Sequence, residues 1–283
     1  MAILSPLRYP GGKDKTYNYI KHLVNINNVS TYIEPFAGGA AVALRLLINK
    51  DVKKIIINDY DRGIYALWNT IVIQPEKLIQ LIQDTPIDMS QWYIQREIQK
   101  QKDSIDELTL AFSTLFLNRT NRSGIIKAGV IGGKKQDRTD KLDCRFNKET
   151  IIKRIRLIAS YSDQIKVCNY DAKEFIEEEI KKTRYSLTFF DPPYYHKGPD
   201  LYTNFYSHED HVELAKIIQT KMRNRYWILT YDIASQIEAL YHKQIHTKYY
   251  LNYSIATPTK GQEFMFFSNK TETGQYQEFL QIV

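Results

Sequence analysis

The 283-residue chain has only two cysteines, Cys144 and Cys168, and their spacing matches no metal-binding motif. We therefore expect neither a disulfide framework nor a zinc site, and a reducing compartment suits the chain. No stretch approaches the roughly 20 consecutive apolar residues that span a bilayer, so no membrane segment is predicted. The opening residues, MAILSPLRYPGGK, are interrupted too early by Pro, Arg and Gly to predict a signal peptide.

Acidic residues are too few to balance the basic ones. The 39 Lys and Arg against 32 Asp and Glu give a net charge of +7, which favours a polyanionic partner without identifying it. Tyrosine is frequent, with 21 residues, and aromatic side chains among cations suit stacking on bases. There are no internal repeats, and the length allows one large α/β domain or one domain with an insertion.

A glycine-rich segment follows the first predicted strand. The β-rich run Thr31–Ile33 is followed by EPFAGGAA, Glu34–Ala41, and then by a predicted helix to about Asn49. Strand, glycine-rich turn and helix form the nucleotide-binding opening of a doubly wound sheet. The order GxGxxG is missing, so a dinucleotide site is not indicated. The small residues still let a ligand approach the backbone and the helix N-terminus.

Two acidic residues follow later predicted strands. Asp59 comes after the strand Lys53–Ile57 and lies about 20 residues beyond Gly39, where a carboxylate can hold both hydroxyls of a ribose. The alternative for Asp59 is capping of the helix predicted at Arg62–Ile73. Asp171, after a short strand, either caps the helix predicted at Ala172–Lys181 or binds a heterocyclic amine.

The stretch from about Tyr65 to Ile165 breaks this pattern and is predicted to be mostly helical. An apolar helix over Leu108–Leu117 leads into glycine-rich, cation-rich loops. Such loops suit phosphate contacts, and Asn or Arg can reach base edges, whereas the alternative is a solvated surface loop. The candidate nucleic-acid-binding residues are Asn118, Arg119, Asn121, Arg122, Lys134, Lys135 and Arg138.

The most distinctive stretch is SLTFFDPPYY, Ser186–Tyr195, an apolar strand that ends in Asp191, Pro192, Pro193 and Tyr194. Proline has no N–H and holds φ near about −65°, so this turn is stiff. The carboxylate and the first proline's carbonyl can both accept hydrogen bonds from one amino group, and the tyrosine can stack on its ring. The alternative is an ordinary proline-rich turn with a structural aspartate.

Three other features bear on the ends of the chain. The loop PLRYPGGK, Pro6–Lys13, carries two cations and an aromatic residue before a predicted helix. His208 and His211 are three residues apart, but no third ligand is evident, so capping and packing are predicted rather than metal binding. Lys248–Ala256 and Glu263–Ser268 predict a closing hairpin.

Taken together, PLRYPGGK, EPFAGGAA, INDYD and FFDPPYY resemble the Dam-like, D12-class N6-adenine DNA methyltransferases, in the order of that family's alpha group. The resemblance covers nearly the whole chain and is loosest between residues 65 and 165. It implies an α/β fold, with the Rossmann-like sheet of class I S-adenosylmethionine-dependent methyltransferases. It also implies a catalytic domain over 1–64 and 166–283, and a mostly helical target-recognition insertion over 65–165.

The resemblance also implies residue roles. The catalytic turn would be Asp191, Pro192, Pro193 and Tyr194, with the tyrosine stacked on the target base. Asp59 would hold the cofactor's ribose and Asp171 its adenine amino group. The residues implied to contact S-adenosylmethionine are Tyr9, Lys13, Glu34, Pro35, Phe36, Gly38, Gly39, Asp59, Asp171, Phe190 and Asp191, and no metal is implied.

The implied activity is methyl transfer from S-adenosylmethionine to N6 of an adenine flipped out of double-stranded DNA at a specific site. Two acceptors would draw the amine hydrogens into place and aim the nitrogen lone pair at the methyl group. The alternatives are an enzyme acting on cytosine N4 or on RNA, a non-catalytic DNA-binding protein and a protein-glutamine methyltransferase. Cytosine enzymes more often have Ser, and glutamine enzymes Asn, where this chain has Asp191.

Partners and location follow from the same resemblance. We expect double-stranded DNA as the substrate and a cognate restriction endonuclease as a possible partner. We expect a monomer or weak dimer in the cytoplasm, associated with the nucleoid of a bacterium or present in a phage-infected cell.

Overall fold

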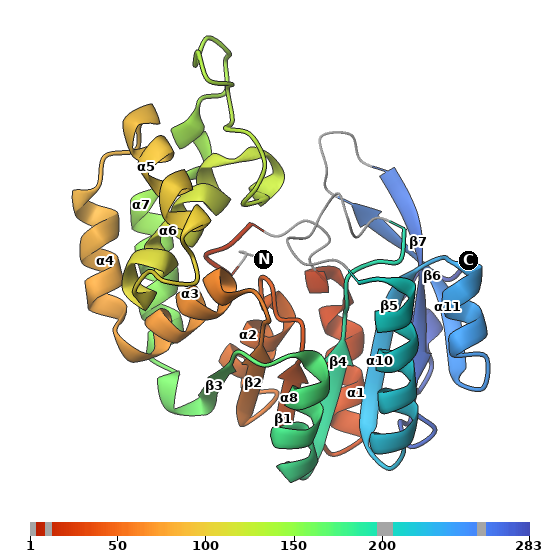
Figure 1. Cartoon of the computed structure of the whole chain (residues 1–283). Helices are drawn as coiled ribbons and strands as arrows, with labels where there is room; N and C mark the ends of the chain where they lie inside the picture. Colours follow the sequence, from red (N-terminus) through yellow and green to blue (C-terminus); the bar gives the residue numbers. More distant parts are fainter. Residues whose placement is uncertain (1–3, 9–12, 197–205, 254–258) are drawn as a thin grey trace.

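A computed structural model describes residues 4–8, 13–196, 206–253 and 259–283 (Figure 1). It contains a seven-stranded sheet in the order β3-β2-β1-β4-β5-β7-β6. The strands are β1 (Thr31–Glu34), β2 (Lys54–Asn58), β3 (Ile165–Cys168), β4 (Ser186–Phe190), β5 (Tyr226–Asp232), β6 (Ile245–Tyr253) and β7 (Thr259–Phe267). The predicted α/β fold is confirmed.

The first five strands of this order are parallel, and β7 runs antiparallel to both of its neighbours, β5 and β6. Strands β1 and β4 lie side by side at the centre, with Ile33 paired to Thr188. All five residues of β4 are buried, as expected for a parallel strand that is covered on both faces. The closing hairpin predicted from the sequence is formed by β6 and β7.

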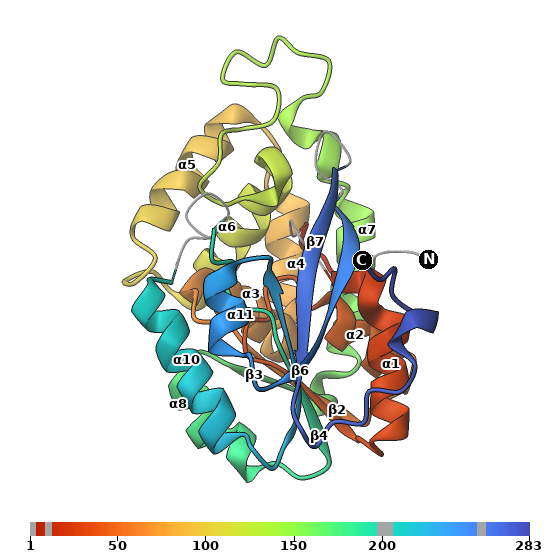
Figure 2. The same ribbon diagram turned by 90° about the vertical axis from the view of Figure 1, so that its right-hand side faces the viewer.

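Helices cover both faces of the sheet (Figure 2). One face packs against α1 (Tyr17–Ile26), which follows the short 3₁₀ helix η1 (Lys13–Thr16), and against α2 (Ala41–Ile48). The other face packs against α8 (Ala172–Glu178), α10 (His208–Lys221) and α11 (Ser235–Leu240). Alternate residues of β2 serve the two faces: Ile55 and Ile57 belong to one core and Ile56 to the other.

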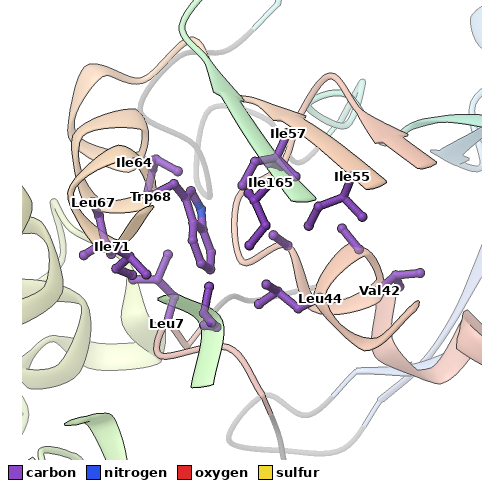
Figure 3. Close-up of a cluster of buried hydrophobic side chains, with 14 of the residues drawn as sticks. Leu7, Val42, Leu44, Ile55, Ile57, Ile64, Leu67, Trp68, Ile71 and Ile165 are labelled. Atoms are coloured by element: carbon purple, nitrogen blue, oxygen red, sulfur yellow. The ribbon is translucent and has the colours of Figure 1, made fainter. Parts of the chain in front are cut away.

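A group of helices lies beside the β3 edge of the sheet (Figure 1). Its members are α3 (Arg62–Ile73), α4 (Pro75–Asp84), α5 (Met89–Lys100), α6 (Glu107–Thr120) and α7 (Lys148–Ala159). Its core continues into that of the sheet, because Trp68 of α3 packs close to Ile57 and Ile165 (Figure 3).

Two helix ends differ from the predictions. The apolar helix predicted at Leu108–Leu117 runs on to Thr120 as α6, which places Asn118 and Arg119 in the helix rather than in a loop. The helix predicted at Ala172–Lys181 ends at Glu178 and is followed by a 3₁₀ turn. None of the helices in the described ranges is both long and apolar enough to cross a membrane.

Candidate active site

Four neighbouring parallel strands carry an acidic residue at their carboxyl ends. Glu34 is the last residue of β1, Asp59 follows β2, Asp191 follows β4, and Asp171 lies three residues beyond β3. Ligands of open α/β sheets bind at this edge. The sheet thus brings together acids that lie up to 157 residues apart in the sequence.

Lys13 joins this edge from the N-terminal segment and is 6% exposed. Its Nζ lies 2.8 Å from Oδ1 and 2.9 Å from Oδ2 of Asp191, and it donates to the Tyr194 hydroxyl at 2.8 Å. Glu263 Oε1 lies 3.6 Å from the same nitrogen. Burial lowers the pKa of Lys13, but the charges of Asp191 and Glu263 outweigh burial and raise the pKa overall, so the side chain is an ammonium.

Asp191 is held between two donors. Besides Lys13, the Thr230 hydroxyl of β5 donates to Asp191 Oδ1 at 2.6 Å. Burial raises the pKa of Asp191, Lys13 opposes that rise, and the Glu263 charge adds to it. The side chain is still 23% exposed, so a ligand can reach it. Asp191 is therefore a fixed, accessible acceptor.

The turn after Asp191 is fixed from β5. The Asp232 carboxylate accepts the backbone N–H of Tyr195 at 2.8 Å and that of His196 at 3.0 Å. Thr230 and Asp232 lie two residues apart, so they point to the same face of the strand. Pro192 and Pro193 are buried between these anchors.

Tyr194 is only 3% exposed. Its hydroxyl accepts from Lys13 and donates to Glu263 of β7, and the Tyr249 hydroxyl of β6 donates to the other oxygen of Glu263 at 2.5 Å. These hydrogen bonds of the hydroxyl fix the position of the Tyr194 ring, which was predicted to stack on a base.

Sequence analysis did not single out Thr230, Asp232 or Glu263. A signal exists for Glu263, because it is the single acid in the apolar run GQEFMFF, and acids are almost never fully buried without a partner. Thr230 and Asp232 carry no such signal, since their role depends on the pairing of β4 with β5.

The glycine-rich turn after β1 is linked to Asp59. Gly38, with φ of 45°, donates its N–H to Asp59 Oδ2 at 2.9 Å, and the Trp68 indole donates to the Gly38 carbonyl at 2.9 Å. Burial, with the nearby charge of Asp61, raises the pKa of Asp59 to about 7. The capping alternative belongs to Asp61, which accepts the N–H groups of the first turn of α3.

The remaining cofactor candidates have mixed surroundings. Glu34 is buried and accepts the Ala43 N–H of α2 at 3.2 Å, and burial raises its pKa to about 8. Asp171 caps α8 by accepting the Lys173 N–H at 2.9 Å. Phe36 is half-buried and meets the edge of the Tyr206 ring, with centroids 6.0 Å apart.

Three other cofactor candidates have no exposed side chain at this edge of the sheet. Pro35 and Gly39 are buried in the turn, and Phe190 is fully buried in the core between the sheet and α10. Tyr9 lies outside the described residues.

The two histidines, His208 and His211, have different surroundings. His211 is buried, its Nδ1 lies 2.8 Å from the Tyr231 hydroxyl, and burial lowers its pKa to about 4. His208 is exposed, with its Nδ1 3.1 Å from the Tyr195 hydroxyl. Within the described part of the chain, no three His, Cys, Asp or Glu side chains are grouped to hold a metal.

Three of the predicted DNA contacts are buried within the helical group. Asn118 accepts the Arg8 N–H and donates to the carbonyls of Arg8 and Gly124, each at 2.8 Å. The buried Arg119 donates to the Pro6 carbonyl at 2.7 Å, and burial, with the charges of two other arginines, lowers its pKa to about 10.

Asn121, the third, accepts the Trp92 indole N–H at 2.7 Å and donates to the Ile126 carbonyl at 2.8 Å. These three side chains connect the N-terminal segment and the loop after α6 to the helices. The other four candidates are exposed: Arg122, Lys134, Lys135 and Arg138.

Comparison with known proteins identifies the chain. A family model described as D12 class N6 adenine-specific DNA methyltransferase matches residues 9–257. The chain belongs to this family. As a D12 methyltransferase, the enzyme transfers a methyl group from S-adenosylmethionine to N6 of adenine in DNA, at specific sites. The alternatives based on cytosine, RNA or protein substrates, and on loss of activity, are therefore not supported.

Several named methyltransferases are similar to this D12 enzyme. Type II methyltransferase M.MjaIII of Methanocaldococcus jannaschii is 23% identical over 239 residues, which cover 76% of this chain and 79% of the relative. Type II methyltransferase M.CviBI of Paramecium bursaria Chlorella virus NC1A is 23% identical over 253 residues, 87% and 90% of the two chains. Modification methylase StsI of Streptococcus sanguinis is 40% identical over 83 residues, 29% of this chain and 12% of the relative.

The acidic edge fits S-adenosylmethionine. That molecule offers ribose hydroxyls, an adenine amino group, an ammonium and a cationic sulfur, all of which pair with carboxylates. Among the four acids, Glu34, Asp59 and Asp191 have raised pKa values, and burial of the charge is the largest cause in each case. Such groups gain from a ligand that brings donors or positive charge.

Proposed function

We propose that Asp191 and the Pro192 carbonyl accept the two hydrogens of the target adenine amine and so aim its lone pair. The observation that supports this role is the position of the Asp191 carboxylate, which Lys13 and Thr230 hold at the carboxyl end of β4 while leaving it exposed to a ligand. The amine is a poor nucleophile because its lone pair is delocalised into the ring, so orientation supplies much of the rate.

Lys13 acts on this step through Asp191. A buried carboxylate takes up a proton readily, and a protonated Asp191 would lose an acceptor site. Burial raises the pKa of Asp191, and the ammonium 2.8 Å away opposes that rise and so favours the charged acceptor. When bound, S-adenosylmethionine supplies a methyl group on a cationic sulfur. The chain's own residues orient the amine, and we assign no strong base, since the amine becomes acidic only after it has gained the methyl group.

The target adenine has to leave the DNA stack, because its amine is inaccessible within a duplex. We assign Tyr194 as a wall for the flipped base. Its fixed hydroxyl supports that assignment by holding the ring in one orientation. Its low exposure means that DNA binding must uncover the ring before the base can stack on it.

We assign target recognition to residues 65–165. The exposed cations Arg122, Lys134, Lys135 and Arg138 follow α6 in a loop that extends beyond the helices (top of Figures 1 and 2). Exposed cations suit contacts with DNA phosphates.

Type II methyltransferases among the relatives support a cognate restriction endonuclease as a functional partner. We also propose that the enzyme is a monomer or weak dimer and acts on DNA in the cytoplasm.

The catalytic assignment is tested with methyl-labelled S-adenosylmethionine and DNA. Wild type should place the label in N6-methyladenine. Asp191→Ala should lower transfer by at least about 10³-fold while keeping part of the cofactor affinity. Asp163→Ala, an exposed acid before the amino end of β3, is the matched control and should transfer normally. Substantial transfer by Asp191→Ala would show that the roles are misassigned.

The DNA surface is tested by salt dependence. Arg122→Ala and Arg138→Ala should each weaken DNA binding and lower the slope of log affinity against log salt by about 1. Lys182→Ala removes another exposed cation, near the amino end of β4, and should leave that slope unchanged. If Arg122→Ala and Arg138→Ala both keep the wild-type slope, the DNA surface lies elsewhere on the enzyme.

A further inference from the structure

The projecting loop, residues 131–142, extends beyond the helical group (top of Figures 1 and 2). Its first arm begins beside the end of α6, where Ile131 donates its N–H to the Thr120 carbonyl at 2.9 Å. Its second arm ends at the short 3₁₀ helix η3 (Leu142–Arg145). The base of the loop is therefore attached to α6, the helix whose last turn also holds the N-terminal segment.

The side chain of Gln136 connects the two arms of the loop. Its Nε2 donates to the Ile131 carbonyl at 2.7 Å and to the Gly133 carbonyl at 2.6 Å. Its Oε1 accepts the Leu142 N–H at 2.9 Å. Exchange of the amide nitrogen and oxygen would set the oxygen against two carbonyls, so these partners fix the orientation of the carboxamide. The bonds to Ile131 and Leu142 join the start of the loop to its end.

The backbone of the loop is sharply bent around these bonds. Gln136 has a φ of 51°, a value that residues other than glycine seldom adopt. At Gly132 a Cβ atom would lie 2.7 Å from the Asp140 carbonyl oxygen, so the two arms are in close contact. An unfavourable backbone conformation persists where the surrounding contacts outweigh its cost. The three hydrogen bonds of the Gln136 carboxamide are such contacts, so the shape of the loop depends on this side chain.

The tip of the loop carries charges of both signs. Its exposed charged residues are Lys134, Lys135, Asp137, Arg138 and Asp140. The cations suit DNA phosphates, whereas phosphates repel carboxylates. A carboxylate on a surface that binds DNA suits a base edge, because the N4 amino group of cytosine donates to Asp in the major groove. Such a bond depends strongly on distance and angle, so it requires a loop of fixed shape.

We propose that Gln136 is a positioning residue for site recognition, which holds the projecting loop in the shape that presents Asp137 and Asp140 to the N4 edge of cytosine while the neighbouring cations contact phosphates. This inference rests on the proposed assignment of target recognition to residues 65–165. Without the carboxamide the cations remain, so affinity for DNA of any sequence is kept. The two acids are no longer held at base edges, so discrimination between sites is lost.

The first test compares methylation of two DNAs. One carries the recognition site, found by sequencing the adenines that wild type methylates, and the other differs from it by one base pair. Glycine adopts a positive φ freely, so Gln136→Gly removes the carboxamide without adding backbone strain. The ratio of kcat/KM for the two DNAs should fall by about 10-fold or more, while the salt slope and melting temperature stay those of wild type. An unchanged ratio would overturn the proposal.

The second test changes the acids themselves. Asp137→Asn or Asp140→Asn should lose discrimination at a G·C pair of the site, and Gln136→Gly should lose it at the same pair. A loss spread evenly over all positions of the site in Gln136→Gly would indicate a merely structural role. Wild-type discrimination in both asparagine variants would overturn the proposal, whether or not Gln136→Gly folds.

Asn28→Gly is the matched control for Gln136→Gly. Asn28 is exposed, has a φ of 50° and precedes the insertion in the sequence, so the same backbone change is made outside the loop. It should keep the wild-type kcat/KM ratio, and an equal loss there would overturn the proposal. If Arg122→Ala and Arg138→Ala both keep the wild-type salt slope, the proposed DNA surface fails. If they lower it and Gln136→Gly keeps its discrimination, only the role of Gln136 fails.

Discussion

Asn118→Ala should destabilise the enzyme rather than remove a DNA contact. The Asn118 side chain is buried and makes three hydrogen bonds of 2.8 Å, to the N–H and carbonyl of Arg8 and to the carbonyl of Gly124. Water can reach the half-buried Arg8 groups after truncation, whereas the Gly124 carbonyl is left buried and unpaired. With about 0.5–1.5 kcal/mol for each of the first two bonds and about 1–3 kcal/mol for the buried carbonyl, the loss of stability is about 4 kcal/mol.

That loss corresponds to a fall in melting temperature of about 7 °C for a chain of this length. The assay is calorimetric or circular-dichroism melting, together with DNA binding at several salt concentrations below the melting range. The salt slope should be that of wild type, because no charge is removed. Arg122→Ala is the matched control and should show the opposite pattern, a lower slope with an unchanged melting temperature. A stable Asn118→Ala with weakened DNA binding would refute the buried, structural role.

Three further outcomes follow from the structure. Asp232→Ala should lower the transfer rate by about 10-fold or more with little change in cofactor affinity, because it frees the Tyr195 and His196 N–H groups that follow the turn at Asp191. Equal losses of rate and affinity would indicate a wider disturbance of the structure. Arg119→Ala should lower the free energy of unfolding by about 2 kcal/mol, measured in urea, because the buried Pro6 carbonyl loses its partner. Burial raises the pKa of Glu34 from 4.5 to about 8, so the folded cofactor-free chain holds a proton that the unfolded chain releases, and its free energy of unfolding should fall as pH rises through this range. Glu34→Gln should flatten that decline in urea titrations at a series of pH values, and an unchanged decline would assign it to other groups.

Local patterns in the sequence were enough to predict most of the sheet and its acidic edge. Apolar runs of four to seven residues bounded by polar turns predict buried strands, and the acids that follow β1, β2 and β4 are adjacent to those runs in the chain. The stiff turn at Asp191 is also a local property, since proline restricts its own backbone. Resemblance of these motifs to a known family then predicted the activity, which the family match confirms.

Local patterns could not predict that Asn118 and Arg119, two of the predicted DNA contacts, are buried. A polar residue after an apolar helix is read as exposed, but α6 continues to Thr120 because the N-terminal segment and the following loop pack against its last turn. Asn118 and Arg119 satisfy backbone groups of Pro6 and Arg8, more than 100 residues away. No local signal specifies such a partner.

The sequence by itself therefore determined the succession of strands and helices along the chain, the acids at the strand ends and the stiff turn Asp191–Tyr194, because each depends on neighbouring residues. Only the tertiary structure decided which side chains surround that turn. Lys13 and Glu263 lie 178 and 72 residues from Asp191 in the sequence. Lys13 of η1 contacts Asp191 directly, and Glu263 of β7, which β5 separates from β4, lies 3.6 Å from the same ammonium. Charge balance at a buried carboxylate depends on distances of a few ångströms, and those distances exist only once the chain is folded.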